Sequence, residues 1–301
     1  PQVIADLENT NQPSSALGHL CEALYRRWKQ DLGPFSIVSC DNLPSNGKVL
    51  RGLLIEFAKL RDAELADWIE DRVTCPSSMV DRIVPATTQE DRQNVQKQLG
   101  LEDQGVVVTE GFSQWVLEDN FCAGRPAWEE VGVTMVDDVT PFEHMKLRML
   151  NGTHSTLAYL GFIAGHEFVA DAANDSDFQQ LLLEMWQDEI IPTLSMPVGI
   201  DLQAYAHDLV ARYQNPELHH RLYQIAMDGS QKLPQRLLGT LRDHLAANRL
   251  PKRVLLAIAG WMRYVTGIQE NGNGFEVQDP LTPQLQKLSL IHISEPTRPL
   301  H

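Results

Sequence analysis

The feature of the sequence that most limits its fold is a change of pattern near residue 140. Before it, helical periodicity alternates with short apolar runs rich in β-branched residues; after it, apolar residues recur only at helical spacing. Helices alternating with short strands are typical of an α/β layer with parallel strand pairing. The sequence therefore predicts an α/β domain over 1–138 and an all-helical domain over 139–288.

The expected elements follow from the same periodicities. In the first part, helices are expected at 16–30 and 48–69, and strands at 35–40, 106–109, 115–117 and 131–136. In the second part, helices are expected at 142–163, 177–191, 201–213, 233–248 and 253–268. An aspartate in the N-cap position, Asp177 or Asp201, opens two of them.

Composition narrows the class of protein. The chain has 301 residues, 43% hydrophobic and 22% charged, which is ordinary for a globular protein, and its net charge of −15 opposes binding to nucleic acid. No apolar run reaches the roughly 18 residues of a membrane span, and the start PQVIADLENTNQ lacks the features of a signal peptide. The four cysteines are scattered without a CxxC pair. We expect a cytoplasmic protein with reduced thiols that binds neither nucleic acid nor membranes.

The segment from Lys146 to His154, KLRMLNGTH, carries the most chemistry. On an α-helix, successive residues turn by about 100°, so Asn151 lies near 140° and His154 near 80° from Lys146, roughly on one side. A lysine of lowered pKa can accept a hydroxyl proton, an amide can donate to the resulting oxygen, and a histidine can orient the substrate. The alternative is an amphipathic helix with a solvated lysine.

Three further segments hold candidates. Asn42 follows the run FSIVSC, where ligands of α/β sheets bind, although Asp-Asn is also a common turn pair. Asp81 stands between apolar residues and needs a partner, either a ligand or a base such as Arg82. Lys232, before Leu-Pro, is suited to hold a substrate oxygen or simply to end a helix.

Several common sites are missing from the sequence. It contains no HExxH, GxSxG, Walker A or DxDxDG motif. His219 and His220 are adjacent, so on a helix they would point about 100° apart and could not easily share a metal. We therefore expect no metal site.

Five strings together resemble the polyol-specific long-chain dehydrogenase family, which includes mannitol 2-dehydrogenase and fructuronate reductase. They are SCDNLPSNG, CPSSMVDRIVPATT, QWVLEDNF, GRPAWEEVGVTMVDDVTPFEHMKLRMLNGTHS and MDGSQKLPQR. They occur in the expected order over nearly everything from Pro1 to about Lys287.

The resemblance implies a fold, a cofactor and roles. The family has an N-terminal Rossmann-like domain and a mostly helical C-terminal domain; its members use NAD or NADP without a metal, and many are monomeric. It implies a general base at Lys146, oxyanion donors at Asn42 and Asn151, and a substrate-contacting histidine at His154. An active-site aspartate falls on Asp81, and a second lysine falls on Lys232.

The sequence departs from the family pattern at both ends. No GxGxxG occurs, so the glycine-rich nucleotide loop is expected upstream of Pro1, and the chain is expected to be a fragment whose cofactor-binding residues are unknown. The stretch SLIHISEPTRPLH, 289–301, does not continue the helical pattern and resembles a translated cloning adaptor. We expect it to be a non-native tail.

A third departure concerns the substrate. Mannitol-type members carry an arginine eight residues before the lysine that matches Lys232, whereas this chain has Gln224. The string YQIAMDGSQKLPQR is more similar to the mannonate and fructuronate branch, so a hexuronate is the favoured substrate, with Lys232, Arg236 or Arg221 as candidates to hold its carboxylate. The alternatives are a mannitol- or arabinitol-type polyol dehydrogenase, and an inactive remnant that only packs against a partner.

Overall fold

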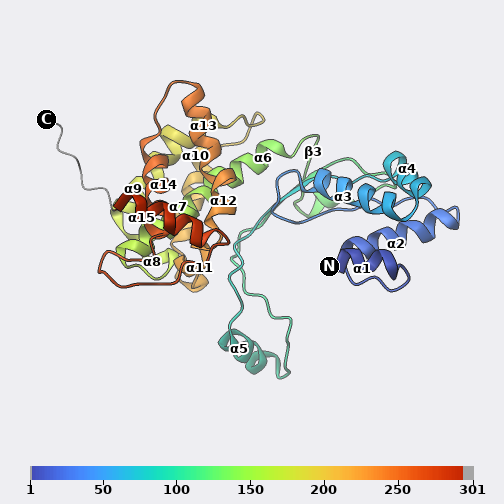
Figure 1. Ribbon diagram of the computed structural model, residues 1–301, viewed down its shortest axis with the longest axis horizontal. Coiled ribbons are helices and arrows are strands. Elements are labelled where there is room, and N and C mark those ends of the chain that lie inside the picture. Colours follow the sequence, from blue (N-terminus) through green and yellow to red (C-terminus); the bar gives the residue numbers. More distant parts are fainter. Residues whose placement is uncertain (1, 294–301) are drawn as a thin grey trace. The chain divides into compact units, whose positions relative to one another are not determined.

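The computed structural model describes residues 2–293 (Figure 1), which divide into two compact units. The first comprises Pro1–Arg82 and Ser113–Glu143, and the second comprises Ile83–Phe112 and His144–His301. The sequence did not single out the stretch 83–112, which interrupts the first unit along the chain.

The first unit is built on helices α1 (Gln2–Glu8), α2 (Ala16–Lys29), α3 (Asn46–Arg61) and α4 (Ala63–Arg72). The predicted single helix over 48–69 is in fact two helices, because Asp62 ends α3 in an extended conformation and its carboxylate accepts from the first N–H groups of α4. Apolar faces of α2, α3 and α4 form one buried core around Leu24, Leu54 and Leu65.

The sheet of this unit has three strands in the order β1-β2-β3, namely β1 (Ser78–Asp81), β2 (Gln114–Glu118) and β3 (Thr134–Val136). β2 pairs antiparallel with β1 and parallel with β3. The predicted strands at 115–117 and 131–136 are therefore confirmed in part, while purely parallel pairing is wrong. A short apolar run does not reveal the direction of its neighbour.

Two predicted strands are not strands in the structure. Residues 35–40 run extended with Ile37 buried, but among the described residues their backbone pairing is limited to one bond, from the Ile37 N–H to the Thr74 carbonyl. Residues 106–109 are also extended, and Val107 is exposed. Apolar β-branched composition favours an extended backbone, but a strand also needs a paired neighbour.

The second unit is helical apart from its extended segments. Its longer helices are α5 (Gln89–Leu99), α7 (Thr153–Ala164), α9 (Ser176–Glu184), α10 (Leu202–Tyr213), α12 (Gly229–Arg236), α13 (Leu238–Ala246), α14 (Lys252–Tyr264) and α15 (Thr282–Ile293). Shorter ones are α6 (Thr140–Met145, which begins in the first unit), α8 (Val169–Asn174) and α11 (Leu222–Ala226). Two π-helical segments are η2 (Lys146–Gly152) and η3 (Met185–Ile190). Short 3₁₀ turns are η4 (Ile191–Thr193) and η5 (Pro216–Leu218) here and η1 (Trp128–Val131) in the first unit.

Several expected helices are subdivided. The stretch 142–163 contains α6, η2 and α7; 177–191 contains α9 and η3; and 233–248 is broken at Leu237, between α12 and α13. Asp201 is the N-cap of α10 as predicted, whereas α9 is capped by Asp175 and not by Asp177. The stretch from Ser289 was expected to leave the helical pattern, yet α15 runs to Ile293; residues 294–301 lie outside the described residues.

Helix α7 forms the centre of the second unit. It is apolar on nearly all sides, with Leu157, Ala158 and Tyr159 fully buried, as expected for a helix surrounded by others. Helices α11 and α14 pack against it. A Cβ at Gly260 of α14 would lie 2.5 Å from a methyl group of Leu160, so a larger residue there would require the Leu160 side chain to move.

The stretch 83–112 is fastened to the rest of the second unit by a buried ion pair. Arg212 of α10 donates to both carboxylate oxygens of Glu110 at 2.9 and 2.7 Å, and one of those oxygens also accepts from the Ile83 N–H at 2.6 Å. Both ends of the stretch are thereby held beside α10. Within it, α5 buries no residue and is stabilised locally by a Thr88–Asp91 capping box.

Candidate active site

Lys146 and Asn151 lie on the π-helical segment η2 and not on a regular α-helix. In a π-helix the repeating bond joins residues five apart, so residue 151 lies one turn along from residue 146 and the two project from the same side. Lys146 is buried, with 9% of its surface exposed. Asn151 is half-buried, and within residues 2–293 its side-chain amide makes no hydrogen bond.

The side chains around η2 compensate for its irregular backbone. The Trp186 indole N–H donates to the Met149 carbonyl at 2.9 Å, and the Tyr213 hydroxyl donates to the Leu150 carbonyl at 2.7 Å. The Thr153 hydroxyl also donates to the Met149 carbonyl. Buried carbonyls need such donors when the regular helical pattern is broken. These three side chains therefore stabilise the turn that aligns Lys146 with Asn151.

His154, at the start of α7, lies among aromatic rings. Its ring stacks on Tyr213 with centroids 5.3 Å apart, and it meets His220 edge to face at 4.9 Å. His154 is 7% exposed, and its buried Nε2 has no hydrogen-bond partner within the described part of the chain. A buried imidazole nitrogen of this kind is available to a ligand oxygen.

The surroundings of the two histidines favour their neutral forms. Burial, followed by the neighbouring His220, Arg236, Arg212 and Lys232, holds the pKa of His154 well below its usual value. Burial, followed by Lys232, lowers the pKa of His220 to about 4. At neutral pH both rings are therefore uncharged and can each donate one hydrogen bond and accept another.

Helix α12 brings Lys232 and Arg236 to the same cluster, one turn apart. The Lys232 ammonium donates to the Met227 carbonyl at 2.6 Å, and the Arg236 guanidinium donates to the Ser155 hydroxyl at 3.0 Å. Burial is the main cause that lowers the pKa of each. Gln224, by contrast, is exposed on α11. Of the substrate-binding residues predicted in this unit, Lys232 and Arg236 thus lie near His154.

The remaining candidates belong to the first unit. Asn42 is exposed in the turn between the extended segment 35–40 and α3, and Asp81 is the last residue of β1, with 2% of its surface exposed. The turn is held by Asn46, whose amide donates to the carbonyls of Ser39, Asp41 and Ser78 and whose oxygen accepts from the Ser78 N–H. Asn42 is therefore presented by a rigid turn beside the strand.

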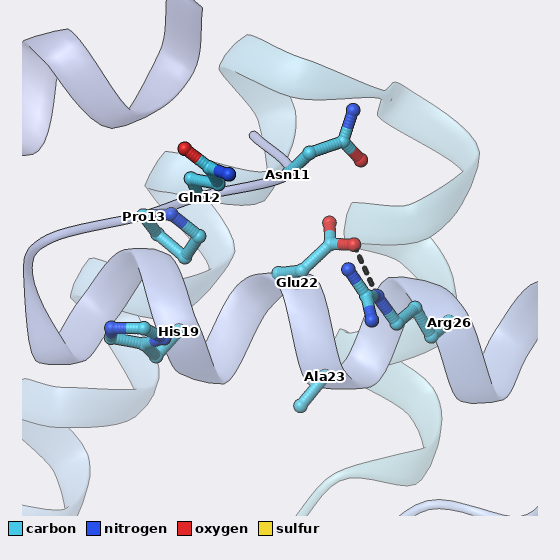
Figure 2. Close-up of a pocket in the computed structure, with 7 residues that line it drawn as sticks. All are labelled: Asn11, Gln12, Pro13, His19, Glu22, Ala23 and Arg26. Atoms are coloured by element: carbon cyan, nitrogen blue, oxygen red, sulfur yellow. Dashed lines mark hydrogen bonds and ion pairs between the residues drawn. The ribbon is translucent and has the colours of Figure 1, made fainter. Parts of the chain in front are cut away.

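Two pockets outlined among the described residues lie away from these candidates. One, of about 550 Å³, is formed by α2 and the loop before it (Figure 2), with lining residues Asn11, Gln12, Pro13, His19, Glu22, Ala23 and Arg26. Its acid, Glu22, is already paired with Arg26 and Arg61 at 2.5 Å each. The other, of about 680 Å³, is mainly apolar and is lined by α7, α9 and α14. Neither includes a catalytic or substrate-binding residue predicted from the sequence.

Among residues 2–293, no group of three or more histidine, cysteine or acidic side chains is placed to hold a metal ion. Over the same residues, no helix is both long and apolar enough to cross a membrane.

The sequence did not identify two residues of the His154 cluster. Tyr213 was assigned only to an amphipathic helix, yet it supports both η2 and the His154 ring. His220 was set aside on the assumption of a helical His-His pair; in the structure it lies between η5 and α11, after His219 in a left-handed conformation. The Asn215-Pro216 pair was the available signal that the helix stops there.

Two family models match the chain. Residues 2–130 match the mannitol dehydrogenase Rossmann domain, and residues 138–300 match the mannitol dehydrogenase C-terminal domain. A Rossmann-like domain followed by a helical domain is the fold predicted from the sequence, which is thereby confirmed. The chain belongs to the mannitol dehydrogenase family.

Individual relatives are similar over almost all of the chain. D-mannonate oxidoreductase of Escherichia coli is 49% identical over 96% of this chain and 60% of its own length, and mannitol dehydrogenase 2 of Saccharomyces cerevisiae is 43% identical over 95% and 57%. Among solved structures, the Pseudomonas fluorescens mannitol 2-dehydrogenase complex with NAD and D-mannitol has a TM-score of 0.84 at 41% identity, covering 96% of this chain and 59% of that one. The chain spans about 60% of the length of these relatives.

Proposed function

We propose that the protein oxidises D-mannonate to D-fructuronate with NAD, and catalyses the reverse reduction. The supporting observation is a partly buried cluster of two cations, Lys232 and Arg236, and two neutral imidazoles, His154 and His220. This cluster lies next to the turn that carries Lys146 and Asn151. A sugar acid supplies both the hydroxyl and the negative charge that such a group suits. The 49% identity to a D-mannonate oxidoreductase supports the same substrate.

Each predicted residue has a proposed role. Lys146 removes the proton of the reacting hydroxyl, and Asn42 and Asn151 donate hydrogen bonds to the oxygen as negative charge develops on it. His154, being neutral, orients the substrate by a hydrogen bond and does not act as a cationic acid. Asp81, Lys232, Gln224 and Arg236 are proposed to bind the remaining substrate oxygens.

NAD would accept the hydride when bound; NADP remains an alternative. The described residues fit only part of such a cofactor site: the rigid turn that presents Asn42 suits the reacting end, but the 301 residues contain no glycine-rich loop for the phosphates. We therefore assign no residue of this chain to the pyrophosphate. We also propose a cytoplasmic monomer whose substrate domain begins near residue 139.

A neutral polyol is the second candidate substrate. It is favoured by the structural similarity to the mannitol 2-dehydrogenase complex with D-mannitol. The two substrates are distinguished by measuring NADH formation with D-mannonate and with D-mannitol, using the protein extended to the full length of its relatives. We expect kcat/KM to be at least about tenfold higher for D-mannonate, because an enzyme built to bind a polar group discriminates against a substrate that lacks it. A preference for D-mannitol would overturn the substrate assignment.

The inactive-remnant alternative is tested on the 301-residue chain itself. Titration of NADH, followed by its fluorescence, shows whether this part of the protein binds the cofactor. Absence of binding would favour a packing role for this part alone and would leave the family assignment unchanged.

A further inference from the structure

Within residues 2–293, Arg236 is a partly buried cation without an acidic partner. Its Nη1 donates to the hydroxyl of Ser155, a neutral group that is itself fully buried. Among the residues that the structure describes, no carboxylate forms an ion pair with Arg236, which leaves its Nε and Nη2 groups for another acceptor. Removing a guanidinium from water without an anion is unfavourable, so the site is suited to an anionic ligand.

Two unpartnered imidazole nitrogens lie in the same cluster. Nε2 of His154 and Nδ1 of His220 are buried, and neither has a hydrogen-bond partner in the described residues. The two rings are in contact, with centroids 4.9 Å apart. Because buried polar atoms are nearly always bonded, both nitrogens are suited to a hydrogen bond with a bound ligand.

The backbone around His220 is fixed by a turn and by two hydrogen bonds. His219 has a φ of +42°, a strained conformation for a residue other than glycine. The next residues are fixed by a bridge in which the Val169 N–H donates to the His220 carbonyl at 2.9 Å and the Leu222 N–H donates to the Glu167 carbonyl at 3.0 Å. The turn thus sets the direction from which the His220 ring meets His154.

The other two basic candidates are already compensated. Arg221 is 60% exposed and forms an ion pair with Glu167. Lys232 donates to the Met227 carbonyl and lies close enough to Asp228 and Asp279 for their charges to stabilise its own. Of these three basic residues, Arg236 is therefore the one whose charge is not paired with an acidic side chain of the described residues.

We infer that Arg236 and His220, which both neighbour His154, form the carboxylate subsite of a sugar-acid substrate, an inference that rests on the proposed function. The guanidinium presents the paired N–H groups that match a carboxylate, and the neutral His220 ring donates one further hydrogen bond. This subsite distinguishes an aldonate from the neutral polyol of the same carbon chain.

The test measures binding rather than turnover. The full-length protein loaded with NADH cannot oxidise D-mannonate, so calorimetry yields a Kd for the acid without reaction. We expect Arg236→Gln to weaken D-mannonate binding by about 10- to 100-fold, the range of charge-assisted hydrogen bonds, and His220→Phe by roughly fivefold. Arg221→Gln removes the same charge from the neighbouring exposed site and is the matched control, expected to change Kd by less than about twofold.

Further measurements guard against a folding defect. Arg236→Lys keeps the charge but loses the paired N–H groups, so binding should be intermediate between wild type and Arg236→Gln. D-mannitol binding should change by less than about threefold in either variant, since this ligand lacks the charged group. Equal weakening for acid and polyol, or a larger effect at Arg221 than at Arg236, would overturn the inference.

Failure of the inference and failure of the proposed function give different results. Arg236-dependent binding of D-mannonate without NADH formation in the NAD-loaded enzyme would refute the function and support the subsite. Oxidation of D-mannonate with an unchanged Kd in Arg236→Gln would support the function and refute the subsite. No binding of D-mannonate by the wild type would refute both.

Discussion

Tyr213 and Tyr264 are both buried, but they differ in whether the hydroxyl has a hydrogen-bond partner among the described residues. The Tyr213 hydroxyl donates to the Leu150 carbonyl of η2, whereas the Tyr264 hydroxyl is buried without a partner in the described residues. Tyr213→Phe removes one donor from a buried carbonyl that also accepts from the Thr153 N–H, and should lower the free energy of unfolding by about 0.5–1.5 kcal/mol. Tyr264→Phe should cost about zero or stabilise. Urea unfolding of both variants gives the two changes in the free energy of unfolding. Equal changes would show that the Tyr213 hydroxyl does not stabilise η2.

His220 gives a pH dependence of stability with a definite sign. Its pKa is about 4 in the folded protein against an ordinary 6.5, because of burial and the nearby Lys232. Between those two values the unfolded chain binds a proton that the folded chain does not, so this residue lowers stability as the pH falls from about 7 to about 4. Above 6.5 it contributes no slope.

His220→Gln should therefore flatten the stability curve on the acid side. The expected reduction in the loss between pH 7 and pH 4 is at most about 3 kcal/mol, since one pKa unit corresponds to about 1.4 kcal/mol and the ring is not fully buried. Urea midpoints of wild type and variant at several pH values provide the measurement. Parallel curves would show that His220 titrates normally in the folded protein.

At the scale of elements, η2 and α12 approach each other closely. A Cβ on Gly152 would lie 2.8 Å from the Arg236 carbonyl oxygen, too close for any real contact with backbone. Gly152→Ala should therefore displace α12, lower the free energy of unfolding by about 1–3 kcal/mol and impair the cluster of Lys232 and Arg236.

Gly239→Ala on α13 is the matched control. Its added Cβ would meet Arg148 at 3.6 Å, an ordinary contact, so the helical preference of alanine should stabilise by about 0.5–1 kcal/mol. Opposite signs for the two variants in thermal unfolding are expected. A neutral Gly152→Ala would show that η2 and α12 are not tightly packed.

The local structure of η2, of residues 35–40 and of the turn at His219 could not be predicted from the sequence. The periodicity of 142–163 correctly indicated continuous helical winding, but it could not reveal the π turn, because that turn depends on donors supplied from Trp186 and Tyr213, far along the chain. The run 35–40 was apolar enough for a strand, yet pairing depends on neighbours. Likewise, His220 lies beside His154 because of a turn with a positive φ at His219, and hydrophobic periodicity does not predict such a turn.

At the scale of the whole molecule, the two-part organisation and the family were predictable, since long motifs in fixed order carry them. The family models confirm both. The roles of Asn42, Asp81, Lys146, Asn151 and Gln224 stay predictions, as do the domain limits and the tail. Burial of Lys146 and the unbonded amide of Asn151 on one turn, within the described residues, are the observations that support their proposed roles.

The proposed mechanism depends on Lys146 as the general base. In the full-length protein with NAD, Lys146→Ala should lower kcat for D-mannonate by roughly 10²–10⁴-fold and change its pH profile, with NADH binding retained, because a positioned base contributes about that much. Lys252→Ala, an exposed lysine of the same unit, should leave kcat unchanged. A loss of less than about tenfold in Lys146→Ala would show that Lys146 is not the general base.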